Sequence, residues 1–137
     1  MRRARAAGFL NIVVTNQPDV ASGRITQSEV EAMHEMLRQN LDVDDIEVSY
    51  DPSGSEALRR KPNPGMLIDA AEKWQISLET SFMIGDRAVD MLAARRAGCV
   101  AVFIDRKYTA DPRPESFDHS ATNVLDAVLW CVAQQSD

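Results

Sequence analysis

The chain has 137 residues, a length that suits one domain with its own buried core. Its 15 basic and 21 acidic residues give a net charge of −6, which argues against sequence-independent nucleic-acid binding, because such binding needs clustered cations. A small anionic substrate is not excluded, since a few well-placed cations outweigh the bulk sign locally. The two cysteines, Cys99 and Cys131, fit neither a disulfide framework nor a zinc site. Without an apolar stretch of membrane-spanning or signal-peptide length, we expect a cytoplasmic protein.

The first half of the chain alternates short apolar runs with amphipathic stretches. We expect, in order, a helix end (2–7), a strand buried on both faces (9–14), a loop (16–23), a helix (26–40), a short strand (46–50) and a polar loop (51–60). The run Thr26-Gln27-Ser28-Glu29 is typical of a capping box that opens the second of these helices. We expect the buried face of that helix to carry Val30, Met33 and Leu37.

The second half continues the same alternation. We expect a helix opened by Asn63-Pro64, a strand (81–84), a helix that ends at Ala97, a strand (100–104), an irregular segment (105–120) and a last helix (124–134). Strands separated by helices imply a mostly parallel sheet with right-handed crossovers. We therefore predict an α/β protein with one domain over residues 1–137 and no internal boundary.

Polar side chains stand where two of these strands end. Thr15 and Asn16 follow the first strand, and Asp86 follows the strand at 81–84. Ligands of open parallel sheets bind just beyond the carboxyl ends of the strands, so a hydroxyl and an amide there can donate to phosphate oxygens. The alternative for Thr15 and Asn16 is ordinary turn chemistry, which is the more common role of such a pair.

The segment Gly85-Asp86-Arg87-Ala88-Val89-Asp90 carries two acids four residues apart. If a helix begins at Asp86, Asp86 and Asp90 share one face of it. Mg²⁺ usually takes one or two protein carboxylates and leaves its other positions to water and substrate phosphate. The alternative is an acid that complements the helix dipole, which explains Asp86 better than it explains Asp90.

Two cations, Arg60 and Lys61, precede Pro62 at the end of the polar loop. A lysine there can reach the cleft as a point charge, and an arginine can grip a phosphate with two hydrogen bonds. The alternative is a solvated basic patch formed by Arg59, Arg60 and Lys61.

Taken in order, Val-Val-Thr-Asn-Gln, Arg-Lys-Pro-Asn-Pro-Gly-Met-Leu and Met-Ile-Gly-Asp-Arg-Ala-Val-Asp-Met resemble motifs of the haloacid dehalogenase (HAD) phosphatase superfamily. The resemblance runs from about residue 7 to 104 and is closest to the cap-poor histidinol-phosphate and heptose bisphosphate phosphatases of subclass IIIA. It implies a Rossmann-like three-layer α/β/α fold and Mg²⁺-dependent phosphoryl transfer on a small phosphorylated metabolite.

The same resemblance assigns roles to six residues of this chain. It implies that Thr15 binds the transferring phosphate and that Lys61 stabilises its charge. It also implies that Asn16 and Arg60 contact the substrate and that Asp86 holds Mg²⁺. Asp90 is then either a carboxylate just outside the ligands of the metal or an alternative metal ligand.

The chain departs from the family pattern at two places. The family nucleophile is the first aspartate of an Asp-x-Asp motif that ends a strand preceding Val-Val-Thr-Asn, and here the sequence opens in the helix just before that run. Asp42-Val43-Asp44 has the letters but follows an amphipathic helix, so we interpret it as a solvated turn. The loop before Arg60 lacks the Cys and His residues with which close relatives bind zinc.

These departures leave three hypotheses. The first is a phosphatase of this superfamily that lacks its first strand, is N-terminally incomplete and is catalytically impaired. The second is a non-catalytic phosphate-binding or interaction module derived from such an enzyme, and the third is a receiver-like signalling domain. Because the absent strand would leave unpaired edges in mid-sheet, we also expect an altered strand order or a homo-oligomer formed through that edge.

Overall fold

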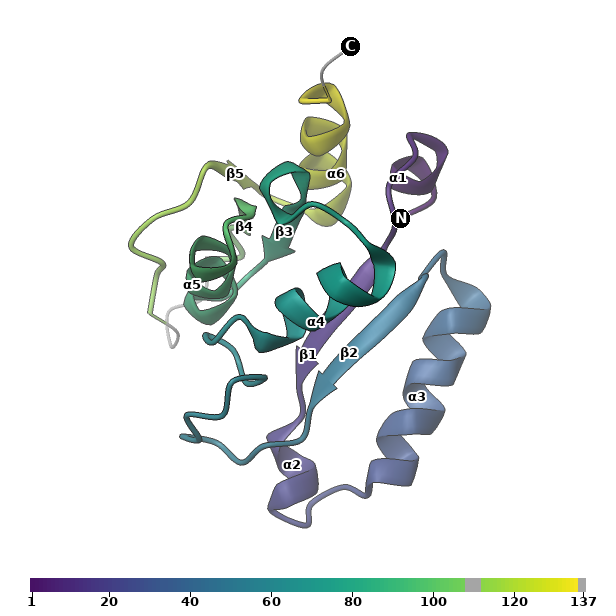
Figure 1. The fold of residues 1–137 in the computed structure, drawn as a ribbon, viewed down its shortest axis with the longest axis vertical. Helices are drawn as coiled ribbons and strands as arrows, with labels where there is room; N and C mark the ends of the chain where they lie inside the picture. The colour runs from purple at the N-terminus through teal and green to yellow at the C-terminus, as the bar shows by residue number, and fades with distance from the viewer. Residues whose placement is uncertain (108–111, 136–137) are drawn as a thin grey trace.

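The computed structural model describes residues 1–107 and 112–135 (Figure 1). Its first half contains α1 (Arg2–Ala6), β1 (Ile12–Asn16), α2 (Pro18–Ala21), α3 (Gln27–Asn40) and β2 (Asp45–Ser49). Its second half contains α4 (Gly65–Trp74), a 3₁₀ turn (Leu78–Thr80), β3 (Phe82–Gly85), α5 (Ala88–Ala97), β4 (Val100–Ile104), β5 (His119–Ala121) and α6 (Val124–Ala133).

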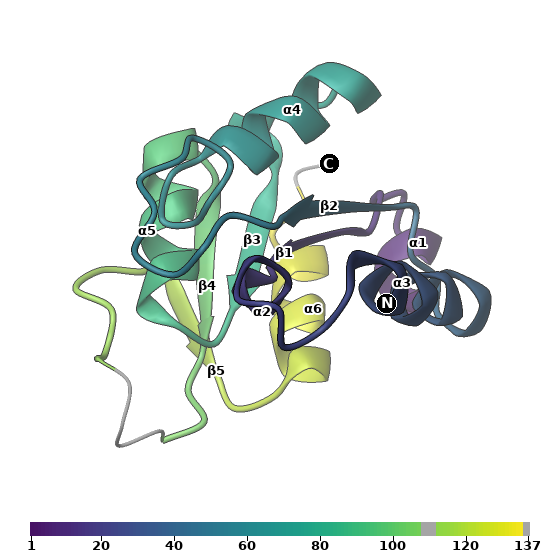
Figure 2. The ribbon, with the colours of Figure 1, turned by 90° about the horizontal axis from the view of Figure 1, so that it is seen from below.

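The strands form two sheets, and every pairing is parallel. β1 pairs with β2, and a second sheet has the order β3-β4-β5. The predicted parallel α/β class is therefore confirmed, but the sheet is divided, since no strand of residues 1–107 and 112–135 lies between β1 and β3. Figure 2 shows α4 on one side of the strands and α6 on the other, which is the predicted layering of helices around strands.

Two apolar clusters hold the second sheet between its helices. One joins Met83, Met91 and Phe103 between the sheet and α5. The other joins Val102, Ile104 and Ala127 between the sheet and α6. β4 is the best-protected strand, because it is paired on both edges and four of its five residues are buried. The hydrophobic core of the protein thus lies between the β3-β4-β5 sheet and the helices α5 and α6.

Several local predictions need correction. The first strand lies at Ile12–Asn16 rather than 9–14, because Thr15 and Asn16 pair with Val48 and Ser49 and so belong to the strand. The expected loop at 16–23 contains the short helix α2, and the expected irregular segment at 105–120 ends in β5; its residues 108–111 lie outside the described residues.

The predicted capping box is present at the start of α3. The hydroxyl of Thr26 accepts from the amide N–H of Glu29 at 3.1 Å, and the amide N–H of Thr26 donates to the Glu29 carboxylate at 3.4 Å. The buried face of α3 differs from the prediction, since His34 is buried beside Val30 whereas Met33 is 46% exposed. In residues 1–107 and 112–135, we find no helix with the length and apolar character needed to cross a membrane.

Candidate functional site

The six predicted site residues lie at the carboxyl ends of β1 and β3. Lys61 is at the centre and is in direct hydrogen-bond contact with Asn16, Arg60 and Asp90. Thr15 precedes Asn16 in β1, and its hydroxyl accepts from the side-chain amide of Gln17 at 3.2 Å. The structure therefore brings together side chains from β1, the loop before α4 and the start of α5.

Asn16 binds the main chain of Lys61 with both ends of its amide. Its Oδ1 accepts from the Lys61 N–H at 3.1 Å, and its Nδ2 donates to the Lys61 carbonyl at 3.3 Å. The peptide bond from Lys61 to Pro62 is cis. Asn16 thus fixes the loop that carries Lys61, and its predicted contact with substrate stays a prediction.

The ammonium of Lys61 is held by two oxygens. Lys61 Nζ lies 2.6 Å from Oδ1 of Asp90 and 3.2 Å from the carbonyl oxygen of Val14. Exposed fractions of 13% for the Lys61 side chain and 8% for that of Asp90 show that this pair is largely withdrawn from water. Such a pair is held firmly because either charge alone would be costly to bury. The site therefore contains a fixed positive charge beside the end of β1.

Asp90 has a second bond at the start of α5. Its Oδ2 accepts from the amide N–H of Arg87 at 3.2 Å, which satisfies a donor that the first turn of the helix leaves over. Gly85 permits this arrangement by its size, because a Cβ on Gly85 would lie 2.4 Å from Cβ of Asp90. The glycine is required by this close approach and not by a positive φ.

Asp86 does not share a helix face with Asp90, contrary to the prediction. α5 begins at Ala88, so Asp86 lies in the bend before it, and the four-residue spacing does not set Asp86 and Asp90 side by side on a helix. Asp86 forms an ion pair with Arg106 at 3.4 Å. Within the described ranges, no group of three His, Cys, Asp or Glu side chains is arranged to hold a metal ion. The predicted metal roles of Asp86 and Asp90 stay predictions.

Arg60 contributes a second cation beside Lys61. Its Nη1 donates to the Lys61 carbonyl at 3.1 Å, while its Nε is buried and has no hydrogen-bond partner in the described part of the chain. A buried donor without an acceptor is uncommon in folded proteins and often marks a place where a ligand or water binds.

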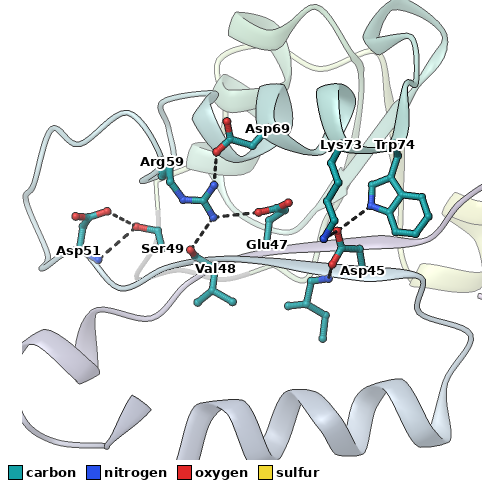
Figure 3. A network of polar contacts seen from close by, with 10 residues as sticks. Asp45, Glu47, Val48, Ser49, Asp51, Arg59, Asp69, Lys73 and Trp74 are labelled. Atoms are coloured by element: carbon teal, nitrogen blue, oxygen red, sulfur yellow. Dashed lines mark hydrogen bonds and ion pairs between the residues drawn. The ribbon is translucent and has the colours of Figure 1, made fainter. Parts of the chain in front are cut away.

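Arg59 anchors the polar loop before α4. The sequence does not indicate this role, because Arg59 is there only one member of a possible basic patch. Its guanidinium donates to the carbonyl of Val48 at 2.9 Å and forms ion pairs with Glu47 and Asp69 (Figure 3). Burial disfavours the charged form, but the hydrogen bonds that Arg59 donates to Glu47 and Asp69 outweigh it and raise the pKa of Arg59. Arg59 therefore ties the loop to both β2 and α4.

The other end of α4 is tied to β2 through Asp45 (Figure 3). Its carboxylate accepts from Nε1 of Trp74 at 2.8 Å and lies 3.0 Å from Nζ of Lys73. Burial opposes ionisation of Asp45, yet the bonds to Trp74 and Lys73 lower its pKa below the usual value. With α4 held at both ends, the position of Lys61 just before it is fixed as well.

Comparison with known proteins identifies relatives of this site. Residues 58–131, which include Lys61, Asp86 and Asp90, match the HAD-hydrolase-like family. A D-glycero-beta-D-manno-heptose-1,7-bisphosphate 7-phosphatase of Rhodopseudomonas palustris is 36% identical over 110 residues, covering 72% of this chain and 61% of the relative. The enzyme of the same name from Escherichia coli K12 is 32% identical over 140 residues, covering 93% of this chain and 72% of the relative.

A solved structure resembles the whole fold. The crystal structure of D,D-heptose 1.7-bisphosphate phosphatase from B. bronchiseptica, complexed with magnesium and phosphate, superposes with a TM-score of 0.81 at 26% identity. The match covers 97% of this chain and 79% of that structure. The chain belongs to the HAD-hydrolase-like family.

Proposed function

We propose that this chain carries the phosphate-binding and Mg²⁺-binding part of a HAD phosphatase that acts on a small sugar phosphate of the heptose-bisphosphate type. The observation that carries the proposal is the Lys61 ammonium, held between Asp90 and the Val14 carbonyl at the carboxyl end of β1. Relatives that are named heptose-bisphosphate phosphatases support the substrate class. Residues 1–137 act as one domain in this proposal.

Within this function, each site residue has a physical role. Lys61 offsets the charge of the transferring phosphate, and the Thr15 hydroxyl donates to one of its oxygens. Arg60 places a second cation beside Lys61 and is proposed to contact the substrate, and Asn16 keeps the loop in place. Asp90 positions Lys61 and is the predicted carboxylate beside the metal's ligands or the alternative metal ligand.

Asp86 is the residue that we propose for Mg²⁺. Its carboxylate is 36% exposed at the carboxyl end of β3, and such an oxygen suits an ion that takes one or two carboxylates and fills its remaining positions with water and phosphate. Mg²⁺ bound there would neutralise charge on the phosphate and orient it. The magnesium and phosphate in the B. bronchiseptica enzyme support this assignment.

We further propose that residues 1–137 by themselves are catalytically impaired. The one Asp-x-Asp sequence, Asp42-Val43-Asp44, lies at the opposite end of β1 from Lys61. Asp44 accepts from the amide N–H of Asn11, just before β1, while Arg5 pairs with both Asp42 and Asp44. Five strand residues separate the two ends by about 16 Å, too far for these acids to attack a phosphate beside Lys61.

A binding assay tests the proposal. Titration of the 137-residue protein with a heptose 1,7-bisphosphate should show Mg²⁺-dependent binding that Lys61→Met weakens by about 10- to 100-fold, since a charge-assisted hydrogen bond contributes about 1.5–3 kcal/mol. Lys73→Met is the matched control, because Lys73 pairs with Asp45 on the β2 side of α4. Circular dichroism confirms that both variants are folded. Equal affinities for the two variants would count against the site.

A turnover assay distinguishes a catalytically impaired protein from an intact enzyme. We expect no hydrolysis of p-nitrophenyl phosphate by the 137-residue protein. Hydrolysis that Asp86→Asn abolishes would overturn both the proposed impairment and the alternative of a non-catalytic binding module, while leaving the phosphate site in place.

A cytoplasmic location, in keeping with the reduced thiols of Cys99 and Cys131, stays a proposal, as does association of two copies through a sheet edge.

A further inference from the structure

The face of β2 that α4 covers is polar. Asp45, Glu47 and Ser49 alternate along β2, so their side chains lie on one face of the strand. Figure 3 shows Asp45 and Glu47 directed towards α4 on that face. Strands of parallel sheets are usually apolar where helices cover them. Here Asp45 and Ser49 are buried and the Glu47 side chain is only 13% exposed, so polar groups take the place of an apolar contact.

Arg59 joins this polar face to α4. Its guanidinium bonds to Glu47 of β2 at 3.1 Å and to Asp69 of α4, and the cation lies between these two acids (Figure 3). It also donates to the carbonyl of Val48 at 2.9 Å. We call Arg59, Glu47 and Asp69 the arginine triad. The arginine triad thus connects the polar loop before α4 to two separate elements of the fold.

Stability alone does not account for the arginine triad. Ion pairs contribute little net stability, because the charges lose hydration when they pair. Apolar side chains would stabilise the contact between α4 and β2 without that cost, but apolar contacts are non-directional. The guanidinium of Arg59 is planar and has its donors in a fixed arrangement, so bonds to three acceptors define one position of the loop. The arginine triad is therefore suited to positioning.

Arg59 and Lys61 hold one short segment from opposite sides. The N–H and the carbonyl of Lys61 are bound by the side-chain amide of Asn16 at 3.1 and 3.3 Å. The Lys61 ammonium extends to Asp90 of α5 at 2.6 Å. Residues 59–61 therefore bridge β2 and α4 on one side and β1 and α5 on the other, and the place of Lys61 depends on both attachments.

We propose that Arg59 is a positioning residue, which acts with Glu47 and Asp69 to set the place of Lys61 in the phosphate site. The guanidinium of Arg59 is occupied by acceptors on β2 and α4, so its effect reaches the phosphate through the chain and not by contact. This inference rests on the proposed function, because Lys61 is the residue through which the arginine triad acts on the ligand.

Electrostatic attraction alone predicts a different sign for part of the arginine triad. Arg59→Met removes a cation and should weaken the binding of an anion by either mechanism. The double variant Glu47→Gln/Asp69→Asn removes two acids, so electrostatic attraction alone should strengthen phosphate binding. If the arginine triad positions Lys61, the same double variant should weaken phosphate binding, because Arg59 loses both of its ionised partners. The double variant therefore separates position from charge.

Titration calorimetry of the 137-residue protein with inorganic phosphate in the presence of Mg²⁺ tests the proposal. Residues that support a binding site typically change affinity by about 10- to 100-fold, and we expect each triad variant to weaken phosphate binding by about 10-fold. Circular dichroism and urea denaturation show beforehand that Arg59→Met and Glu47→Gln/Asp69→Asn are folded at the temperature of the titration.

A second arginine between two acids gives the matched control. Arg5 pairs with Asp42 and Asp44 near the start of β1, and its side chain is 44% exposed, close to the 38% of Arg59. Arg5→Met and the double variant Asp42→Asn/Asp44→Asn should change phosphate affinity by less than about 2-fold at about 0.1 M salt, since charges more than a Debye length from the site are screened.

Amide hydrogen exchange at Lys61, followed by NMR, tests the positioning without a ligand. The N–H of Lys61 donates to Oδ1 of Asn16 at 3.1 Å. Release of the segment in the triad variants should open this bond more often and speed exchange by about 10-fold. The amide of Glu29 also donates to a side-chain oxygen at 3.1 Å, at the distant start of α3, and its exchange rate should not change.

The outcomes separate this inference from the proposed function. If the unsubstituted protein does not bind phosphate, the proposed function fails, and exchange at Lys61 alone decides whether the arginine triad positions that residue. If the unsubstituted protein binds phosphate and Glu47→Gln/Asp69→Asn binds it equally or more tightly, the positioning role is overturned. Unchanged exchange at Lys61 in that double variant would overturn it as well.

Discussion

The ammonium of Lys61 and the carboxylate of Asp90 lie 2.6 Å apart in a largely buried pair that joins the loop before α4 to the first turn of α5. The second oxygen of Asp90 accepts from the amide of Arg87, so the carboxylate also closes the start of the helix. One side chain therefore fixes both the position of the site cation and the direction in which α5 leaves β3. This double role makes Asp90 the residue whose replacement is most informative.

We expect Asp90→Asn to lower the free energy of unfolding by about 3–5 kcal/mol, because it leaves the Lys61 ammonium buried without a counter-charge. Urea denaturation at constant m measures the change. Asp126→Asn is the matched control, since Asp126 is also the third residue of its helix but is exposed and bonds to Asn123. We expect that variant to lose less than about 1 kcal/mol. Equal losses would show that the pair with Lys61 adds nothing.

Gly85→Ala should weaken phosphate binding through Asp90. The new Cβ would lie 2.4 Å from Cβ of Asp90, so Asp90 must move away from Lys61. Overpacking of this kind costs about 1–3 kcal/mol of stability. Gly54→Ala is the control: φ is +82° there, which costs a side chain about 1–2 kcal/mol, but no atom lies within 4 Å. Titration calorimetry with inorganic phosphate should show weaker binding for Gly85→Ala alone, and unchanged affinity in both variants would contradict this mechanism.

The fold was predictable where the local sequence alone defines the ends of a helix or strand. Val100–Ile104 was placed at its observed bounds, because a β-rich run between a helix-stopping glycine and a polar segment has one interpretation. The first strand was shifted, because its ends are set by pairing with β2, which lies more than 30 residues further along the chain. Local patterns do not contain that pairing, nor do they show that β1 and β3 belong to separate sheets.

The six site residues stay predictions, and their contacts could not be predicted from the sequence. Lys61 and Asp90 are 29 residues apart, and no periodicity relates a loop lysine to a helix acid at that distance. The assumption that a helix begins at Asp86 was wrong, because the Asp90 carboxylate bonds to the Arg87 amide and α5 begins at Ala88. Arg59 was indistinguishable from its basic neighbours in sequence, since its role depends on Glu47 and Asp69.

The carboxyl group of Asp105 should titrate at unusually low pH. Hydrogen bonds from the Arg113 guanidinium, at 3.1 Å to each oxygen, are the main reason that the pKa of Asp105 falls to about 2 from 3.8. Because the folded-state pKa is the lower one, the stabilisation by Asp105 is present above about pH 4 and is lost as the pH falls towards 2. NMR titration should return the pKa towards 3.8 in Arg113→Ala. Lys107→Ala, which keeps its amide bond to Asp105, should shift it less.

Cys99 and Cys131 should react slowly with alkylating reagents while the protein is folded. Both thiols line the cavity between β1 and β3, and burial raises the pKa of each to about 11 from the usual 9.0. A shift of about two units lowers the thiolate fraction at pH 8 by about 100-fold, and the thiolate is the species that reacts. Since the folded state keeps these protons to higher pH than the unfolded chain, the free energy of unfolding should fall between about pH 9 and pH 11.

The measurement is the rate of iodoacetamide labelling at pH 8, with and without urea. Cys99→Ser and Cys131→Ser assign the labelling to one thiol at a time, and each remaining thiol should react about 100-fold faster in the unfolded chain. A thiol that reacts equally fast in both states lies open to solvent through the cavity between β1 and β3, which would contradict its burial.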